Sequence, residues 1–177
     1  MEKILVAIDI QKDFVDGSLG TAEACAMLPF AEEKIKNFEG TVIFTKDTHG
    51  ENYLSTQEGR NLPVVHCIKG TDGWNLAGNL EDICKEKGCK VYEKGAFGDY
   101  ELAYDMKTLY EEGKIDSVTL IGLCTDICVI SNALMLKAFC PELPIYVDEK
   151  CCAGVTPEKH AAAIETMKSC QITEEKV

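Results

Sequence analysis

The alternation of short apolar segments with helix-like segments predicts an α/β protein built on a mainly parallel sheet. The apolar segments contain few polar positions, which is typical of strands that are covered on both faces. The 177 residues contain no internal repeat and no low-complexity linker, so the length favours a single domain over residues 1–177. We therefore expect three layers, αβα, with helices on both faces of the sheet.

Five segments are predicted to be strands because they are short, apolar and bounded by turn or polar residues. They comprise residues 3–8, 41–45, 90–93, 115–121 and 144–147. A further short strand is expected near Ile172, which would make the sheet six-stranded.

Helices are predicted between these strands from capping residues and apolar spacing. Pro29 is expected to open an amphipathic helix that has Ile35 and Phe38 on one face and ends at Gly40. Residues 79–87 form the next expected helix, which Gly88 terminates.

The second half of the chain continues this pattern. Asp99 is expected to cap a helix that stops at Gly113, and residues 126–139 form a largely apolar helix. Thr156 is the expected cap of a last helix with Pro157 at its first position.

Four residues with reactive or ligating side chains fall at or just after the ends of separate predicted strands. They are Asp9, Asp47, Lys94 and Cys128. Ligands of open parallel sheets bind beyond the carboxyl ends of the strands. We therefore expect these four side chains to meet in one site.

Cys128 follows an apolar strand and lies at the start of an apolar helix, in the run Gly-Leu-Cys-Thr-Asp-Ile-Cys-Val. In the first turn of a helix, unpaired N–H groups and the helix dipole favour a thiolate. Cys128 is therefore a candidate nucleophile. The alternative is a buried helix cysteine without chemistry.

A thiol that attacks an amide needs a base, and later an acid to protonate departing ammonia. Asp9 can serve as both, and Lys94 can hold the negative charges of carboxylate and thiolate together. The N–H groups of Cys128 and Cys124 are candidate donors to the oxyanion. Alternatively, Asp9 is a turn residue and Lys94 a solvated surface residue.

The loop after the second strand contains a possible metal site. Asp47 and His49 are two residues apart, so an extended backbone projects them to one face. With His66 and, least securely, Glu58, they would suit zinc, iron or manganese. Alternatively, Asp47 and His49 form a turn and His66 is a hydrogen-bonded core residue.

Composition excludes several other classes. The net charge is −12 and no cluster of Lys and Arg is present, which argues against nucleic acid and anionic membranes as partners. The ten cysteines are not spaced like a secreted disulfide framework, and no apolar run could span a bilayer. Because Met-Glu-Lys leads directly into a strand without a signal peptide, we expect a cytoplasmic location.

Five motifs occur in a fixed order and together resemble one family. They are Asp9-Ile-Gln-Lys-Asp-Phe14, Lys46-Asp47-Thr-His49, His66-Cys67, Lys94 and Gly122-Leu-Cys-Thr-Asp-Ile-Cys128-Val129. The pattern resembles the isochorismatase-like cysteine hydrolases and, within them, is most similar to nicotinamidases. The resemblance covers residues 3–172, almost the whole chain.

The resemblance implies the six-stranded isochorismatase-like hydrolase fold and a triad of Asp9, Lys94 and Cys128. A cis peptide between Leu123 and Cys124 would let the N–H groups of Cys124 and Cys128 form the oxyanion hole. The implied reaction is hydrolysis of nicotinamide to nicotinate and ammonia through a thioester, a step of NAD salvage. The family also implies a homo-oligomer, a dimer or a tetramer.

The resemblance further implies a divalent metal at Asp47, His49 and His66, joined in some members by a carboxylate near Glu58. The metal would orient the substrate by binding its ring nitrogen or a neighbouring water. Phe14 matches an aromatic residue that packs on the substrate ring, and Phe97 could supply part of the pocket wall.

Two departures from the family pattern keep other functions open. Residues 61–65 lack the tryptophan that many nicotinamidases have before the third metal ligand, and Thr48 replaces an aromatic residue. The only tryptophan is Trp74. A hydrolase of another small amide, such as a ureido or carbamoyl compound, is therefore an alternative. A non-catalytic, thiol-rich binding or redox protein is another, and the sequence assigns no role to Cys151 and Cys152.

Overall fold

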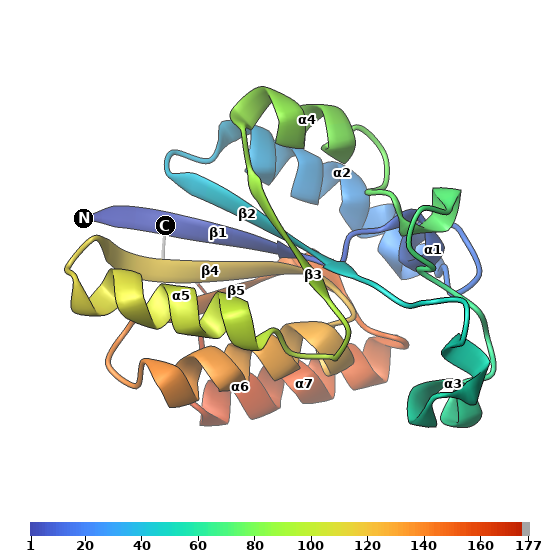
Figure 1. Ribbon diagram of the computed structural model, residues 1–177. Helices are drawn as coiled ribbons and strands as arrows, with labels where there is room; N and C mark the ends of the chain where they lie inside the picture. Colours follow the sequence, from blue (N-terminus) through green and yellow to red (C-terminus); the bar gives the residue numbers. More distant parts are fainter. Residues whose placement is uncertain (175–177) are drawn as a thin grey trace.

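A parallel sheet of five strands forms the centre of the protein in the computed structural model, which describes residues 1–174 (Figure 1). The strand order is β3-β2-β1-β4-β5, and every neighbouring pair is parallel. The direction of winding therefore reverses between β1 and β4, the point where such sheets bind ligands. The strands are β1 (Glu2–Ile8), β2 (Thr41–Asp47), β3 (Lys90–Lys94), β4 (Ile115–Leu123) and β5 (Ile145–Ala153).

Helices cover both faces of the sheet, as the apolar strands predicted. Val6 and Ile8 of β1 pack into one helical layer, whereas Leu5 and Ala7 pack into the other. The first layer contains α5 (Tyr100–Glu111), α6 (Ile130–Phe139) and α7 (Pro157–Ser169). The second contains α2 (Ala22–Asn37) and α4 (Leu80–Lys87). Two short helices, α1 (Lys12–Val15) and α3 (Gln57–Asn61), lie beyond the carboxyl ends of the strands (Figure 1).

The expected sixth strand is not part of the sheet within residues 1–174. Near Ile172 the chain makes a single parallel bridge between Tyr146 and Thr173. Helix α7 ends at Ser169, so only a short segment of the described chain remains to pair with β5. It pairs at a single residue and forms no strand. The domain expected over residues 1–177 extends to residues 175–177, which lie outside the described part.

The prediction that Pro29 opens a helix is wrong. Helix α2 begins at Ala22 and contains Pro29 in its interior, and the side chain of Thr21 caps it by accepting from Ala24 N–H. A proline inside a helix removes one backbone hydrogen bond. The buried side chains of Ala24 and Met27, which precede Pro29 in the same helix, offset this cost by packing in the core on this face of the sheet.

The predicted end at Gly40 is also wrong, since α2 ends at Asn37 with Phe38 as its C-cap, whereas the caps of three other helices are confirmed. Asp99 accepts from Leu102 N–H at 3.1 Å at the start of α5, and Thr156 accepts from Lys159 N–H at 3.3 Å at the start of α7. Gly88 ends α4 in the left-handed conformation, with φ 64°.

Strand β5 is longer than its apolar pattern indicated, and this explains the adjacent cysteines. The register with β4 passes from Leu120 beside Val147 to Gly122 beside Cys152, so β5 bulges between these pairs. Cys151 and Cys152 are buried and pack into opposite helical layers. They are core residues of the strand.

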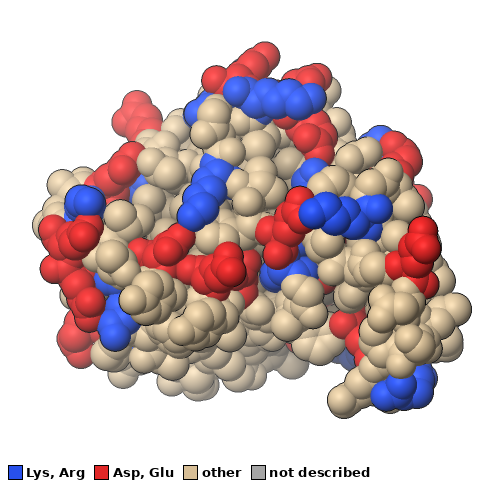
Figure 2. Space-filling model, in the orientation of Figure 1, with Lys and Arg blue, Asp and Glu red and all other residues tan. Residues whose placement is uncertain are grey.

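None of the helices in residues 1–174 is both long and apolar enough to cross a membrane. On the face drawn in Figure 2, basic and acidic side chains are interspersed. Lys90 and Asp105, for example, form an ion pair at 2.7 Å between β3 and α5.

Candidate active site

Asp9, Lys94 and Cys128 meet at the carboxyl edge of the sheet, although they come from three separate segments. Asp9 follows β1, Lys94 ends β3, and Cys128 lies in η3 (Thr125–Val129), a π-helical turn that leads into α6. Lys94 Nζ lies 2.6 Å from Asp9 Oδ2 and donates to Cys128 Sγ at 3.4 Å. The ammonium therefore contacts both a carboxylate and a thiol. Asp9, Lys94 and Cys128 are 0%, 4% and 4% exposed.

Burial dominates the electrostatics of this triad. Burial raises the pKa of the Cys128 thiol well above its usual value, the Asp9 carboxylate adds to this effect, and the Lys94 ammonium opposes it. Burial also raises the pKa of Asp9. This shift is opposite in direction to the one expected from the first helical turn, because burial disfavours the charged form of the thiol.

Lys94 itself stays charged. Burial lowers its pKa, but the neighbouring acidic groups of Asp9, Cys128 and Asp47 raise it by more, so the net shift is upward. A permanent ammonium between the two acidic groups favours the transfer of a proton from sulfur to carboxylate.

Thr45 of β2 completes the surroundings of Asp9, and the sequence patterns did not single it out. Its hydroxyl donates to Asp9 Oδ1 at 2.6 Å, and Asp9 N–H donates to the carbonyl of Thr45 at 3.2 Å. Asp9 has a left-handed backbone, with φ 49°, so the chain turns sharply away from β1 at this residue.

The peptide bond between Leu123 and Cys124 is cis, as the family resemblance implied. Gly122, just before it, has φ 122°, and a Cβ there would lie 2.0 Å from the carbonyl oxygen of Ile8. Only glycine lets β4 approach β1 so closely at this end. The turn that follows holds Val129 N–H against the carbonyl of Cys124 at 3.1 Å, which is π-helical spacing.

The four predicted metal ligands also lie together. One ligand atom from each of Asp47, His49, Glu58 and His66 falls within 4.8 Å of the others. His49 Nε2 lies 3.0 Å from Asp47 Oδ2 and 3.6 Å from Glu58 Oε1. His66 Nε2 lies 3.5 Å and 3.8 Å from the same two oxygens.

This geometry and chemistry fit a divalent cation. Ligand atoms about 2.1 Å from a tetrahedral metal are about 3.4 Å apart, close to the observed separations. His49 Nε2 is buried and makes no hydrogen bond among the described residues. His66 Nδ1 donates to the carbonyl of Val64 at 2.8 Å in the tautomer that leaves Nε2 free, the usual arrangement of a metal-binding histidine.

The metal cluster is held by aromatic packing that the sequence did not predict. The ring of Tyr53 lies 4.7 Å from that of His49 and 4.9 Å from that of His66, centroid to centroid. Its hydroxyl donates to the carbonyl of Leu62 at 2.8 Å. Gly59 packs against this turn, because a Cβ there would lie 2.1 Å from the carbonyl oxygen of Tyr53. Tyr53 thus sets the spacing of the two histidines.

Two backbone contacts bring His66 back to the sheet. A single parallel bridge joins His49 to Ile68, and His49 N–H donates to the carbonyl of Cys67 at 3.0 Å. Asp13 of α1 anchors the same turn by accepting from Cys67 N–H at 2.8 Å.

Gln11 holds Asp47 in place. Its side-chain oxygen accepts from Asp47 N–H at 2.7 Å, and its amide nitrogen donates to the carbonyl of Asp47 at 2.9 Å. The Gln11 side chain thus makes the two hydrogen bonds to the Asp47 backbone that a neighbouring strand would make, beyond the end of β1. Asp47 Oδ1 in turn lies 3.6 Å from Lys94 Nζ, so the metal cluster and the triad are in contact.

The two predicted substrate-contacting aromatic residues, Phe14 and Phe97, differ in burial. Phe14 is 9% exposed, and its ring lies 5.4 Å from that of His66, beside the metal cluster. Phe97 is 47% exposed in the loop after Lys94. Trp74 Nε1 donates to Thr48 at 2.9 Å.

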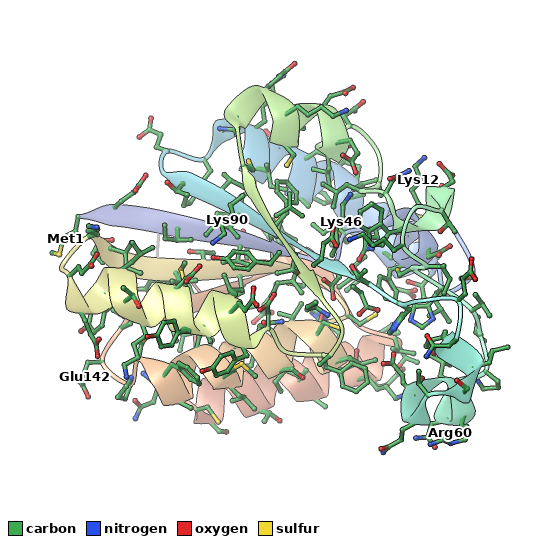
Figure 3. The ribbon with its side chains drawn as sticks, viewed as in Figure 1. Met1, Lys12, Lys46, Arg60, Lys90 and Glu142 are labelled. Atoms are coloured by element: carbon green, nitrogen blue, oxygen red, sulfur yellow. The ribbon has the colours of Figure 1, made fainter. Side chains whose placement is uncertain are left out.

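Lys46, labelled in Figure 3, lies beside the site without taking part in it. Its Nζ lies 4.2 Å from the centroid of the Trp74 ring and 2.7 Å from Glu81 Oε1. Because side chains alternate along β2, it points to the opposite face from Asp47.

Comparison with known proteins supports the resemblance. The family model described as the isochorismatase domain matches residues 3–175. The chain belongs to the isochorismatase family. A Bacillus subtilis (strain 168) relative, described as an uncharacterized isochorismatase family protein, PncA, is 33% identical over 177 residues, covering 93% of each chain.

Solved structures of this family share the fold. The crystal structure of the nicotinamidase/pyrazinamidase PncA from Bacillus subtilis superimposes with a TM-score of 0.83 at 27% identity, covering 99% of this chain and 100% of that one. The pyrazinamidase of Pyrococcus horikoshii in complex with zinc gives a TM-score of 0.81 at 27% identity, with both chains fully covered. The isochorismatase-like α/β fold is thereby confirmed.

Proposed function

We propose that this protein is a metal-containing nicotinamidase, which hydrolyses nicotinamide to nicotinate and ammonia. The observation that carries the proposal is the contact of Lys94 with both Asp9 and Cys128, directly beside the cluster of Asp47, His49, Glu58 and His66. The relatives named nicotinamidase or pyrazinamidase support it. A triad of this kind suits acyl transfer from a small amide to sulfur.

In this proposal Asp9 first acts as the base. It accepts the proton of the Cys128 thiol as sulfur attacks the carbonyl carbon, and Lys94 stabilises the charges that form. The raised pKa of Asp9 helps it keep that proton until it protonates the leaving ammonia. A water, deprotonated by the same carboxylate, then hydrolyses the thioester and releases nicotinate.

The oxyanion of each tetrahedral intermediate needs preorganised donors. The N–H groups of Cys124 and Cys128 are the proposed donors, since both belong to the turn that carries the nucleophile. Phe14, beside His66, is the proposed wall for the substrate ring, and Phe97 is proposed as a more exposed part of the same wall.

Asp47, His49 and His66 would hold the metal, with Glu58 as a fourth ligand. The zinc complex of the Pyrococcus relative favours zinc, with iron or manganese as alternatives. When bound, the ion supplies a Lewis acid that orients the substrate through its ring nitrogen or a water. The Cys128 thiol is activated by Asp9 and Lys94 in this scheme, and the metal cluster contacts the triad through Asp47.

Ammonia release from nicotinamide tests the proposal, with pyrazinamide and a panel of ureido and carbamoyl compounds in parallel. Nicotinamide turnover that exceeds every other compound is the expected result. Val65, which precedes the third predicted ligand, is aliphatic and 49% exposed, so this position offers no aromatic ring to stack on a substrate ring. Preference for a non-aromatic amide is therefore the competing outcome. That outcome would retain the hydrolase and replace the substrate.

The proposed setting is the cytoplasm, because all ten cysteines are free and a reducing compartment keeps them so. Assembly as a homodimer or homotetramer is part of the same proposal, and light scattering on the purified protein tests it.

A further inference from the structure

Asn132 is a buried amide one helical turn after Cys128, and it connects the nucleophile to the loop that follows Lys94. The residue is 1% exposed. Its Nδ2 donates to the carbonyl of Cys128 at 2.8 Å and to the carbonyl of Phe97 at 3.2 Å. Its Oδ1 accepts from Asp99 N–H at 2.9 Å. Both donors and one acceptor position of this amide are therefore used.

Three other contacts hold the loop from Gly95 to Asp99. Gly98 passes against α6 so closely that a Cβ would lie 2.8 Å from Met135 Cε. At one end of the loop, Lys94 Nζ donates to the carbonyl of Ala96 at 3.0 Å. At the other end, Asp99 caps α5. The loop therefore supplies one of the contacts that hold the Lys94 ammonium, in addition to the 2.6 Å contact with Asp9 Oδ2.

We propose that Asn132 is a positioning residue, which fixes the Gly95–Asp99 loop against α6 and thereby holds Lys94 at contact distance from Cys128. The inference deepens the proposed function, because it rests on Cys128 as the nucleophile of that site. Asn132 contacts no reacting atom. It holds the carbonyl of Phe97, and the preceding residue, Ala96, accepts from Lys94 through its own carbonyl.

Three variants separate this role from simple structural support. Asn132→Ala removes all three hydrogen bonds. Asn132→Thr retains only the bond to Cys128, because a helical threonine hydroxyl donates to the carbonyl four residues earlier. Leu136→Ala, one turn further along α6 at a buried apolar position, destabilises the same helix without touching the loop.

The primary readout needs no substrate. Iodoacetamide alkylation of Cys128 is followed by mass spectrometry on its peptide, with exposed Cys25 as the internal reference. kcat and KM for nicotinamide are measured in parallel, at a temperature where all variants are folded. If the wild-type enzyme does not turn over nicotinamide, the proposed function fails while alkylation still tests the positioning role.

We expect Asn132→Ala and Asn132→Thr to lower both the alkylation rate of Cys128 and kcat by at least about tenfold, since small displacements of catalytic groups are costly. Leu136→Ala should stay within about twofold of wild type in both readouts, because it leaves the loop in place. The proposal is overturned if Asn132→Ala retains wild-type alkylation, if Asn132→Thr restores it, or if Leu136→Ala loses it equally.

Discussion

The triad and the metal cluster adjoin each other at one edge of the sheet, yet they are built in different ways. Asp9 and Lys94 lie at strand ends, and Cys128 lies in a turn that continues directly into α6. In the metal cluster only Asp47 belongs to a strand, whereas His49, Glu58 and His66 come from the long connection between β2 and α4.

This difference shows how each part is stabilised. The triad depends on the sheet, in which β1 pairs with β4 below Asp9 and the Cys128 turn, and β2 pairs with β3 at Lys94. The metal cluster depends on packing of the Tyr53 ring and on the anchoring of the loop by Asp13 and Gln11. A rigid scaffold with a site completed by loops is the usual arrangement in α/β enzymes.

The strongest test of the triad is removal of its sulfur. Cys128→Ala should lower kcat for nicotinamide by on the order of 10³-fold or more, because it removes the sulfur that contacts Lys94. Its metal content should equal that of wild type, since the cluster is built from other segments. Exposed Cys25→Ala is the matched control and should keep full activity. Substantial turnover by Cys128→Ala would remove the nucleophile assignment.

The next largest effect is expected at Lys94, where catalysis and stability are linked. Lys94→Met leaves Asp9 buried without its partner, so unfolding should become easier by about 3–5 kcal/mol and kcat should fall at least about 100-fold. Urea denaturation and steady-state kinetics measure the two effects.

The double variant Asp9→Asn with Lys94→Met separates them. It removes both buried charges, so most of the stability should return while activity stays lost. Recovery of activity together with stability would mean that the ion pair is structural only.

A variant of the metal cluster should show the opposite pattern. His66→Ala removes a ligand, so the affinity for the metal should fall by at least about 10- to 100-fold. Less metal should therefore remain bound after dialysis. Alkylation of Cys128 should persist, because Asp9 and Lys94 remain in place. Elemental analysis and peptide mass spectrometry measure these outcomes, and solvent-facing Arg60→Ala on α3 serves as the control (Figure 3). Unchanged metal content in His66→Ala would contradict the ligand set.

The smallest effect is expected at Gln11, which touches the metal cluster only through backbone. Gln11→Leu keeps most of the volume but loses both hydrogen bonds to Asp47, so metal affinity should fall by about tenfold. Fluorescent chelator competition measures this change. A larger loss of metal affinity in Gln11→Leu than in His66→Ala would contradict the assignment of His66 as a ligand and of Gln11 as its more distant support.

The sequence predicted much of the triad for a physical reason. The ends of apolar strands can be located from the sequence, and the carboxyl ends of parallel strands meet at one edge of the sheet. The sequence pattern therefore predicts that Asp9, Lys94 and Cys128 lie together. The upward shift in the pKa of the Cys128 thiol was not predictable, because it depends on how completely the fold buries the sulfur.

The metal cluster was less accessible to such reasoning. The spacing of Asp47 and His49 suggested a shared face, but His66 and Glu58 were grouped with them by ligand type alone, until the family resemblance implied the same set. Tyr53 was missed, because nothing in the sequence marks a loop tyrosine that packs between two histidines. The start of helix α2 was predicted too late in the chain, because proline is more common at the first position of a helix than in its interior.

The most direct measurement is mass spectrometry of the enzyme after acid quench during turnover of nicotinamide. The account predicts a nicotinoyl thioester on the peptide that contains Cys128, present in wild type and absent in Cys128→Ala. An acyl group found on any other residue would contradict it, as would undiminished turnover in the alanine variant.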